Sequence, residues 1–369
     1  MIKLTARRLV AVLVAAGTVA GVVPAALAAS APAAQRSASG SGWRITYHLP
    51  AGAWISHITA TSKKNAWATG CSGGINSCGR ALSWHWDGRN WQQIPMGPGY
   101  AAPAAMAAAP DGTAWMFAQT SDKALAVLRW TGHGWTETKR WPGTVVFAAA
   151  APDARHAWAF GEGYYGAPQY MFRYNGTTWS RTPMPFRLAV SDVTSVSATS
   201  IWAAGNSGGR ELWHWNGSSW TSVPLTLRLP SGAATDLPKV AASGASDVWL
   251  AADVSYSCGN GCSNGVAVLH WDGTGWRQVR APLTLVPGLN VATASLAPDG
   301  RGGCWLVVRG GHATQVLDYS GGQWTRIAAP AGLAGVVGRG IGLMAGLTWI
   351  PGTSSAWAAV PGGIAEYSR

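Results

Sequence analysis

Short stretches of apolar or alternating residues recur along this chain, and each is bounded by Gly, Pro, Asn, Asp or Ser. In the first clear group, residues 55–62 alternate apolar and polar side chains, and shorter apolar stretches follow at 66–70, 81–86 and 91–95. Alternation with a period of two between turn residues is typical of β-strands. The pattern predicts four short strands, named A to D in chain order.

Two motifs built around tryptophan repeat at a regular distance. One is a hairpin that reads WHWDGRNW at 84–91 and returns in five further copies. The other is a strand that reads NAWATG around its tryptophan, occurs seven times and recurs on average about 48 residues apart. This period fits a four-stranded propeller blade, so the sequence predicts an all-β, seven-bladed β-propeller. The seven tryptophans are Trp67, Trp115, Trp158, Trp202, Trp249, Trp305 and Trp357.

The turns within the repeat have a residue signature of their own. Asp-Gly, Asn-Gly or a related pair stands between strands C and D, with Gly88 and Gly217 as examples. Such pairs accept the positive φ of tight hairpins. We expect the A–B and C–D turns to be uniformly short, and the B–C and D–A connections on the opposite face to be long and variable.

The two ends of the repeat region complement each other. Residues 43–50 resemble an isolated fourth strand, whereas residues 364–369 form a third strand that lacks its fourth. An unclosed ring would expose unpaired backbone at two edges. We therefore predict that one N-terminal outer strand joins three C-terminal strands, a 1+3 closure. The domain prediction is a signal peptide at 1–28, a flexible linker at 29–42 and the propeller at 43–369.

The first 28 residues have the features of an export signal. Lys3, Arg7 and Arg8 precede an apolar run at 9–23, and Ala26-Leu27-Ala28 supplies a cleavage pattern of small residues. A membrane helix needs about 20 apolar residues, which favours cleavage over a retained anchor. No later segment is long and apolar enough to span a bilayer. We expect a secreted protein, extracellular or associated with the cell wall, without an integral membrane segment.

The cysteines fit an exported protein. Cys71 and Cys78 flank one B–C loop, and Cys258 and Cys262 flank another. In an oxidising compartment these spacings predict two local disulfides. A zinc site built from all four is the alternative, but it would have to join blades that lie far apart in the ring. Cys304 is expected to be a buried free thiol.

The tryptophans and the charges narrow the class of partner. Thirteen tryptophans fall once per blade in the two motifs, which favours packing between blades over a platform for sugars. The formal charge falls from +12 to +9 without the signal, which carries three basic residues and no acidic one. These charges are dispersed rather than clustered, which argues against nucleic-acid binding.

The combination of a VWAVG-like strand with an HWDGxxW hairpin resembles the secreted propellers common in actinobacteria. The resemblance covers nearly the whole expected mature chain, from Trp43 to Arg369. More loosely, the repeat is similar to kelch and Asp-box propellers, although the Ser-x-Asp-x-Gly-x-Thr-Trp order of the Asp-box is not met. The resemblance implies the fold strongly and the function weakly, because propellers include enzymes, lectins and scaffolds.

No catalytic set emerges from the sequence. There is no GxSxG, P-loop or kinase motif, no marked pair of carboxylates and no HxH or HxxxH spacing for a metal. We expect no catalytic residues, no metal and no cofactor. Ligand-binding candidates are residues that break the repeat on the long-loop face, where loops on a rigid scaffold carry function. They are Tyr100, Tyr164, Tyr165, Arg210, Glu211, Asp253, Tyr256, Arg309 and His312.

The functional prediction is an exported, monomeric, non-catalytic binding module. It would present its long-loop face to an extracellular glycan or protein. One alternative is a lyase or glycoside-active hydrolase at the mouth of the central channel, with His57 or His312 as the base. A second alternative is a structural protein associated with the cell wall.

Overall fold

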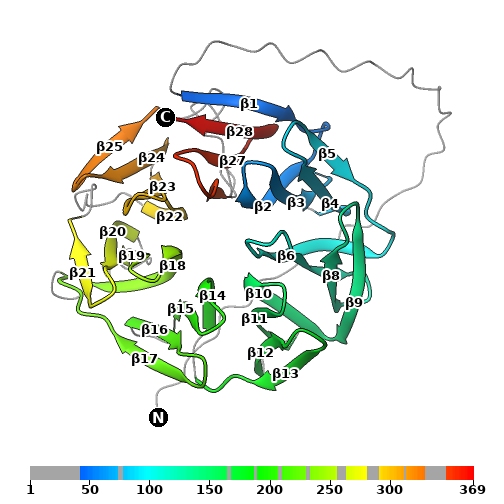
Figure 1. Ribbon diagram of the computed structural model, residues 1–369, viewed down its shortest axis with the longest axis horizontal. Helices are drawn as coiled ribbons and strands as arrows, with labels where there is room; N and C mark the ends of the chain where they lie inside the picture. Colours follow the sequence, from blue (N-terminus) through cyan, green and yellow to red (C-terminus); the bar gives the residue numbers. More distant parts are fainter. Residues whose placement is uncertain are drawn as a thin grey trace. The chain divides into compact units, whose positions relative to one another are not determined.

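Seven antiparallel sheets of four strands surround a central axis (Figure 1). The computed structural model describes residues 42–73, 78–163, 168–186, 189–206, 210–229, 233–255, 263–280, 291–310, 313–328 and 346–369. Each innermost strand contacts the innermost strands of both neighbouring sheets, and β26 contacts β2 to complete the ring. The predicted all-β, seven-bladed propeller is confirmed.

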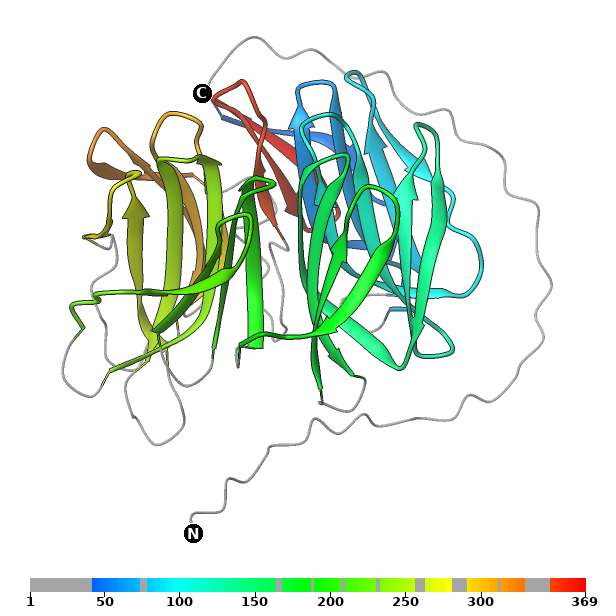
Figure 2. The same cartoon turned by 60° about the horizontal axis from the view of Figure 1, so that its bottom comes forward.

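The strands follow the predicted A to D order, with strand A nearest the axis (Figure 1). Figure 2 shows the same blades turned by 60°. The A strands are β2 (Trp54–Ser62), β6 (Tyr100–Ala108), β10 (Thr144–Asp153), β14 (Ala189–Ser197), β18 (Ala234–Gly244), β22 (Val291–Pro298) and β26 (Leu347–Trp349). The B strands are β3 (Asn65–Cys71), β7 (Ala114–Thr120), β11 (His156–Gly163), β15 (Ser200–Asn206), β19 (Asp247–Ser255), β23 (Cys304–Gly310) and β27 (Ala356–Val360).

The outer half of each sheet contains strands C and D. The C strands are β4 (Ala81–Trp86), β8 (Ala124–Trp130), β12 (Gln169–Tyr174), β16 (Arg210–Trp215), β20 (Ser263–Trp271), β24 (Ala313–Ser320) and β28 (Gly363–Ser368). The D strands are β5 (Trp91–Ile94), β9 (Trp135–Pro142), β13 (Trp179–Pro183), β17 (Trp220–Pro224), β21 (Trp276–Val279), β25 (Gln323–Ile327) and β1 (Gly42–His48).

The seventh sheet closes the ring as predicted. Its order is β1-β28-β27-β26, and β1 pairs antiparallel with β28 from Gly42↔Ser368 to His48↔Gly363. One further backbone bond runs from Leu49 N to Gly362 O at 2.8 Å. The N-terminal strand therefore satisfies an edge that would otherwise be open, and the 1+3 closure is confirmed. The predicted signal at 1–28 and most of the predicted linker lie outside the described residues.

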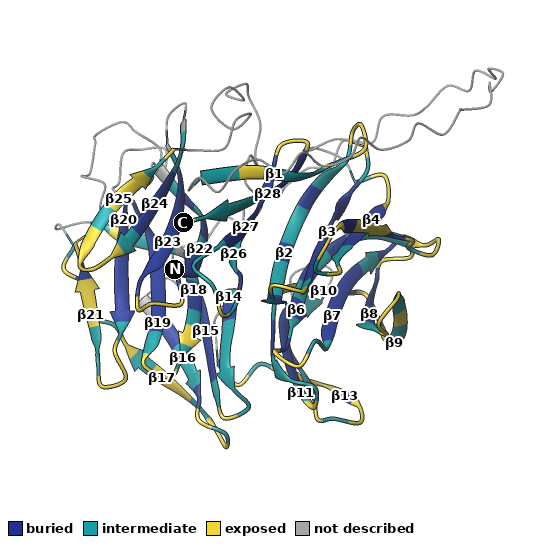
Figure 3. Cartoon of the chain, turned by 45° about the horizontal axis from the view of Figure 1, so that its top comes forward, coloured by how far each residue is buried: buried dark blue, intermediate teal, exposed yellow. Residues whose placement is uncertain are grey.

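The core lies between the blades, and the motif tryptophans form much of it. All seven B-strand tryptophans are at most 4% exposed. Outer-strand tryptophans meet those of the preceding blade edge to face: Trp91 lies 5.4 Å from Trp357, and Trp276 lies 5.5 Å from Trp202, between ring centroids. Figure 3 shows the buried second strands and the more exposed outer strands. The structural role predicted for these tryptophans is confirmed.

The turn chemistry is confirmed for the C–D hairpins and corrected for three A–B turns. Gly88 and Gly217 have φ of 94° and 98°, as expected for this hairpin. The A–B connections of blades one, three, four and five contain two residues each, but those of blades two and six contain five, 109–113 and 299–303, and that of blade seven contains six, 350–355. The prediction that these turns are uniformly short was therefore wrong for blades two, six and seven. In blade seven, Thr353 holds the wider turn together through its hydroxyl group.

The cysteines that can be placed behave as predicted. Cys71 and Cys78 form a disulfide, and Cys304 is a buried free thiol. Burial raises the pKa of the Cys304 thiol well above its usual range. Cys258 and Cys262 lie outside the described residues. Over the ranges given above, no helix has the length and apolar character needed to cross a membrane.

Candidate functional site

The seven A strands surround a central channel of about 610 Å³. Every A strand follows a D–A connection and leads into an A–B turn. It therefore runs from the long-loop face towards the short-turn face. Most lining residues are small, with Ala, Ser and Thr predominating. The titratable side chains of this lining are His57, Asp192 and Lys239.

These three residues occupy equivalent positions in blades one, four and five. In each blade, one residue of strand A pairs in register with the buried tryptophan of strand B. The channel residue lies two positions before that residue in the chain. The equivalent residues of the other blades are small. They are Ala105, Ala148, Ser295 and Gly346. The scaffold itself therefore accepts a small residue at this position, and the charged or titratable groups are additions to it.

Asp192 joins two adjacent blades. Its Oδ1 accepts a hydrogen bond from Val193 N and its Oδ2 accepts one from Val240 N, both at 3.0 Å. Burial raises the pKa of this carboxyl, while the charge of Lys239 and the two backbone donors partly oppose the rise. Each carboxylate oxygen of Asp192 thus accepts one hydrogen bond from the backbone. Only the remaining lone pairs of these oxygens are available to a ligand.

His57 is held in one tautomer by its neighbour. The Ser56 hydroxyl donates to Thr69 O at 3.2 Å, and His57 Nδ1 lies 2.9 Å from the same hydroxyl oxygen. Nδ1 therefore carries the hydrogen, and Nε2 is left as an acceptor. Burial, with a further contribution from the charge of Lys239, lowers the pKa of His57 to about 4. The ring is neutral at pH 7.

Lys239 is the positive charge of the channel lining. It influences the pKa of His57, Asp192 and Asp253, so its ammonium lies within electrostatic range of all three. None of the ion pairs between described residues includes Lys239. A cation of the channel lining that forms no ion pair with a described carboxylate is available to a ligand.

Asp253 was predicted as a loop residue and lies instead in β19, where it is only 4% exposed. It is paired in register with Asp236 of β18 and accepts a hydrogen bond from Thr293 N at 2.6 Å. Burial and the nearby Asp236 raise the pKa of Asp253. The carboxylate therefore links blades five and six rather than projecting into solvent.

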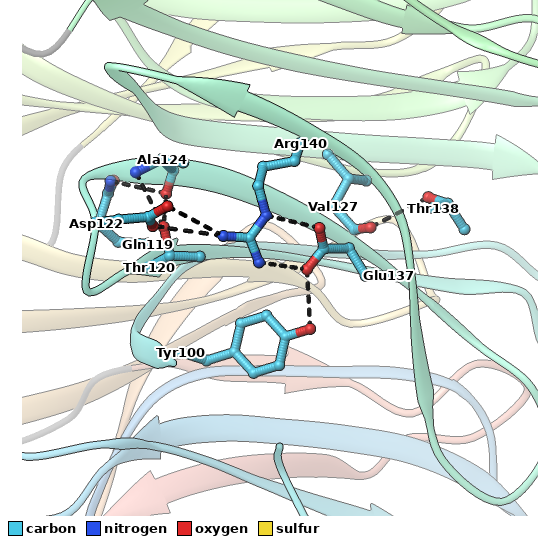
Figure 4. A network of polar contacts seen from close by, with 9 residues as sticks. All are labelled: Tyr100, Gln119, Thr120, Asp122, Ala124, Val127, Glu137, Thr138 and Arg140. Atoms are coloured by element: carbon cyan, nitrogen blue, oxygen red, sulfur yellow. Dashed lines mark hydrogen bonds and ion pairs between the residues drawn. The ribbon is translucent and has the colours of Figure 1, made fainter. Parts of the chain in front are cut away.

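Tyr100 also lies in a strand, at the start of β6. Its hydroxyl donates to Glu137 Oε2 at 3.0 Å (Figure 4). Arg140 holds the same carboxylate through two bonds of 2.8 Å and also approaches Asp122 at 3.4 Å. The Arg140 guanidinium keeps the pKa of Glu137 below its usual range. This network fixes the edge of blade two and leaves the Tyr100 hydroxyl already engaged.

The other candidates divide into two groups. Arg210 and Glu211 lie in β16, and Arg309 lies in β23, so the prediction that they are loop residues was wrong. The reason is that antiparallel pairing continues past the repeated motif, as in Asn206↔Arg210 and Arg309↔Thr314. Tyr164, Tyr165, Tyr256 and His312 lie outside the described residues. The structure does not bring the described candidates together at one point.

The sequence analysis named His57 as a possible base at the channel mouth, and the structure does place it in the channel lining. Asp192 and Lys239 were missed as members of this site because the three residues share no motif. Their signal was a contrast between repeats, in which His, Asp and Lys replace Ala, Ser or Gly at one aligned position. Within the described ranges, the channel lining includes no arginine that could complete a His–Arg–carboxylate set. Among the described residues, no group of three or more His, Cys, Asp or Glu is arranged to hold a metal ion.

Comparison with solved structures gives the same fold. Similar structures include YCF48 bound to D1 peptide, at 15% identity and a TM-score of 0.59, covering 89% of this chain and 96% of that one. The GH74 xyloglucanase from Xanthomonas campestris has 16% identity and a TM-score of 0.62, covering 88% and 53%. The WD40 propeller domain of Doa1 has 10% identity and a TM-score of 0.57, covering 89% and 97%.

These likenesses define a class of protein. The chain is a seven-bladed β-propeller, a fold shared with a peptide-bound protein and with a glycoside hydrolase. No protein-family model and no curated protein matches it. The resemblance to secreted actinobacterial propellers remains a prediction.

Proposed function

We propose that this chain is an exported, non-catalytic binding module. It presents its long-loop face to a glycan or a protein outside the cell. The described residues that support the proposal are those of the central channel around Lys239, since the described loop-face candidates do not gather at one point.

The observation that carries the proposal is the substitution pattern of the channel. His57, Asp192 and Lys239 stand where four other blades have Ala, Ser or Gly, so the fold does not require them. Removing titratable groups from bulk water costs free energy unless they are partnered. Perturbed titratable groups in a cleft are candidates for a functional site. His57 and Asp192 are the perturbed groups here, and Lys239, which is in none of the ion pairs between described residues, would supply the charge that pairs with a ligand.

The same residues favour binding over catalysis. A histidine with a pKa of about 4 is a weak base at neutral pH. Both oxygens of Asp192 already accept backbone hydrogen bonds. The similarity to a xyloglucanase keeps a glycoside-active hydrolase as the second candidate, and the similarity to YCF48 bound to D1 peptide fits a protein or peptide ligand. A wall-associated structural role remains the third.

Export is supported by two independent features. The first is the basic and apolar pattern of residues 1–28. The second is the Cys71–Cys78 disulfide, since disulfides persist in oxidising compartments. The mature chain is expected to be a monomer that needs no cofactor.

A glycan array and a pull-down from cell-wall fractions test the proposal. The wild-type protein is compared with Lys239→Met, and Arg326→Met serves as a control because Arg326 is an exposed outer-strand cation. We expect a captured glycan or protein whose binding weakens at least tenfold in Lys239→Met and is unchanged in the control. Silence of the folded wild type in both assays, or chemical turnover of a captured glycan, would overturn the non-catalytic binding function.

A further inference from the structure

A second hollow, of about 410 Å³, lies on the short-turn face, opposite the face proposed above. It is formed where the A–B turns of blades one, six and seven meet. We call it the Trp349 hollow. Its lining residues are Lys63, Gly300, Arg301, Trp349, Gly352, Thr353, Ser354 and Ser355.

Two cations face this hollow without an internal partner. Lys63 and Arg301 are exposed, and neither takes part in the ion pairs between described residues. The carboxylate beside them, Asp299, is fully buried and already accepts hydrogen bonds from Arg301 N at 2.7 Å and Gly303 N at 2.8 Å. Its other oxygen lies 3.6 Å from Arg369. The side-chain charges of Lys63 and Arg301 therefore remain available to an outside anion.

The wall of the hollow is held rigidly. Trp349 Nε1 donates to Thr353 O at 2.8 Å, which fixes the indole against the turn. Gly300, with φ of 72°, lies so close to this ring that an added Cβ would come within 2.3 Å of Cζ2. The indole thus rests directly on the glycine backbone. A preformed wall reduces the entropy lost when a ligand binds.

The turn that supplies the hydroxyl groups is the longest of the seven A–B connections. Residues 350–355 are six in number, against two in blades one, three, four and five and five in blades two and six. Within this turn, Thr353 Oγ1 donates to Ile350 O and accepts from Ser355 N, both at 2.8 Å. This turn and the five-residue turn of blade six, which supplies Gly300 and Arg301, together form most of the lining of the hollow.

We propose that the Trp349 hollow binds an acidic sugar unit of an extracellular polymer. A carboxylate, sulfate or phosphate group would lie between Lys63 and Arg301, as charge-assisted hydrogen bonds favour. The sugar ring would contact Trp349, and its hydroxyl groups would meet the serine hydroxyls of the turn. Trp349 also lines the channel, but Lys63, Arg301 and residues 352–355 do not, so the charged part of this site does not depend on Lys239. Only the extracellular source of the polymer rests on the proposed function.

Binding of defined polymers to the full chain tests the site. Polygalacturonate and dextran sulfate are the acidic probes, neutral dextran is the uncharged probe and inorganic phosphate is the free anion. The charge variant is Lys63→Met with Arg301→Met. The matched control is Lys64→Met with Arg89→Met, which removes two exposed cations of the same face outside the hollow. Thr353 and Gly300 are left intact so that the turn keeps its structure.

We expect the charge variant to weaken binding of an acidic polymer at least tenfold, and the control to change it less than twofold. Trp349→Ala is expected to weaken polymer binding while leaving any phosphate binding unchanged. Lys239→Met is expected to bind the acidic polymer normally, which separates this site from the channel. Equal losses in the two double variants would show general charge attraction and overturn the proposal. So would binding of phosphate alone, or no binding of either acidic polymer.

Discussion

The guanidinium of Arg369 lies over the indole ring of Trp305, 5.6 Å from its centroid, and forms an ion pair with Asp318. Asp318 is the residue of β24 that pairs in register with Trp305. In blades one to five the equivalent partner of the buried tryptophan is basic. These partners are His85, Arg129, Arg173, His214 and His270. In blade six the partner is acidic, and the adjacent blade supplies the cation.

Replacing Arg369 with Gln is expected to lower the free energy of unfolding by about 2 kcal/mol, because it leaves two poorly exposed carboxylates, Asp299 and Asp318, without their cation. Urea unfolding followed by tryptophan fluorescence measures the change. Arg326→Gln is the control, since Arg326 is an exposed cation on an outer strand. Equal midpoints for Arg369→Gln and the wild type would contradict this role.

Removal of β1 is expected to open the ring. A chain that begins at Gly52 lacks every bond between β1 and β28, whereas a chain that begins at Gly42 keeps them all. The exposed edge of β28 would then be free to pair with other chains. Light scattering and thermal unfolding compare the two proteins, and we expect aggregation and a lower Tm only for the shorter one. A soluble and equally stable shorter chain would refute the importance of the closure.

The fold could be predicted from the sequence because every blade uses the same residue types for its buried positions and its tight turns. Trp67 and its six equivalents have to be buried, and Gly88 and its equivalents have to adopt positive φ, so both leave a periodic signal. The closure could be predicted because the missing strand at one end matched the extra strand at the other. The A–B turns of blades two, six and seven depart from the two-residue length, at 109–113, 299–303 and 350–355, where no periodic signal could reveal a longer turn.

The candidate site could be predicted only in part, because its residues are defined by departures from the repeat. Asp253 and Tyr100 do break the motif, but strand pairing continues through them and gives them structural partners. Lys239 and Asp192 belong to the channel because the ring brings distant A strands together. Nothing in the local sequence of either strand shows that convergence.

The C–D hairpins allow a test of backbone geometry. Gly217→Val is expected to cost about 2 kcal/mol of stability, since a β-branched residue resists positive φ and the added Cβ would come within 2.8 Å of Thr199. Gly275→Val in the equivalent hairpin of blade five is the matched control, because no atom lies within 4 Å of its added Cβ and its φ is not in the left-handed region. Chemical unfolding of both variants measures the difference. Equal effects of the two substitutions would show that the φ of Gly217 is unimportant.

The buried histidine of the channel predicts a defined loss of stability in acid. The pKa of His57 is about 4 in the folded chain and about 6.5 when unfolded. Because the unfolded state binds the proton more readily, this contribution to stability is complete above pH 6.5. It is lost progressively as the pH falls from 6.5 towards 4. The shift corresponds to about 3 kcal/mol across that interval.

His57→Asn removes the titration while an amide nitrogen can still donate to Ser56. Between pH 7 and pH 4 we therefore expect the unfolding free energy of the wild type to fall by about 3 kcal/mol more than that of His57→Asn. The raised pKa of Asp192 and Asp253 acts in the opposite direction in both proteins, so the difference isolates His57. His133→Asn, at an exposed turn, is the control and should follow the wild type. Parallel curves of unfolding free energy against pH for the wild type and His57→Asn would contradict this prediction. They would mean that the imidazole of His57 has the same proton affinity in the folded and unfolded states, and so is not held neutral in the channel.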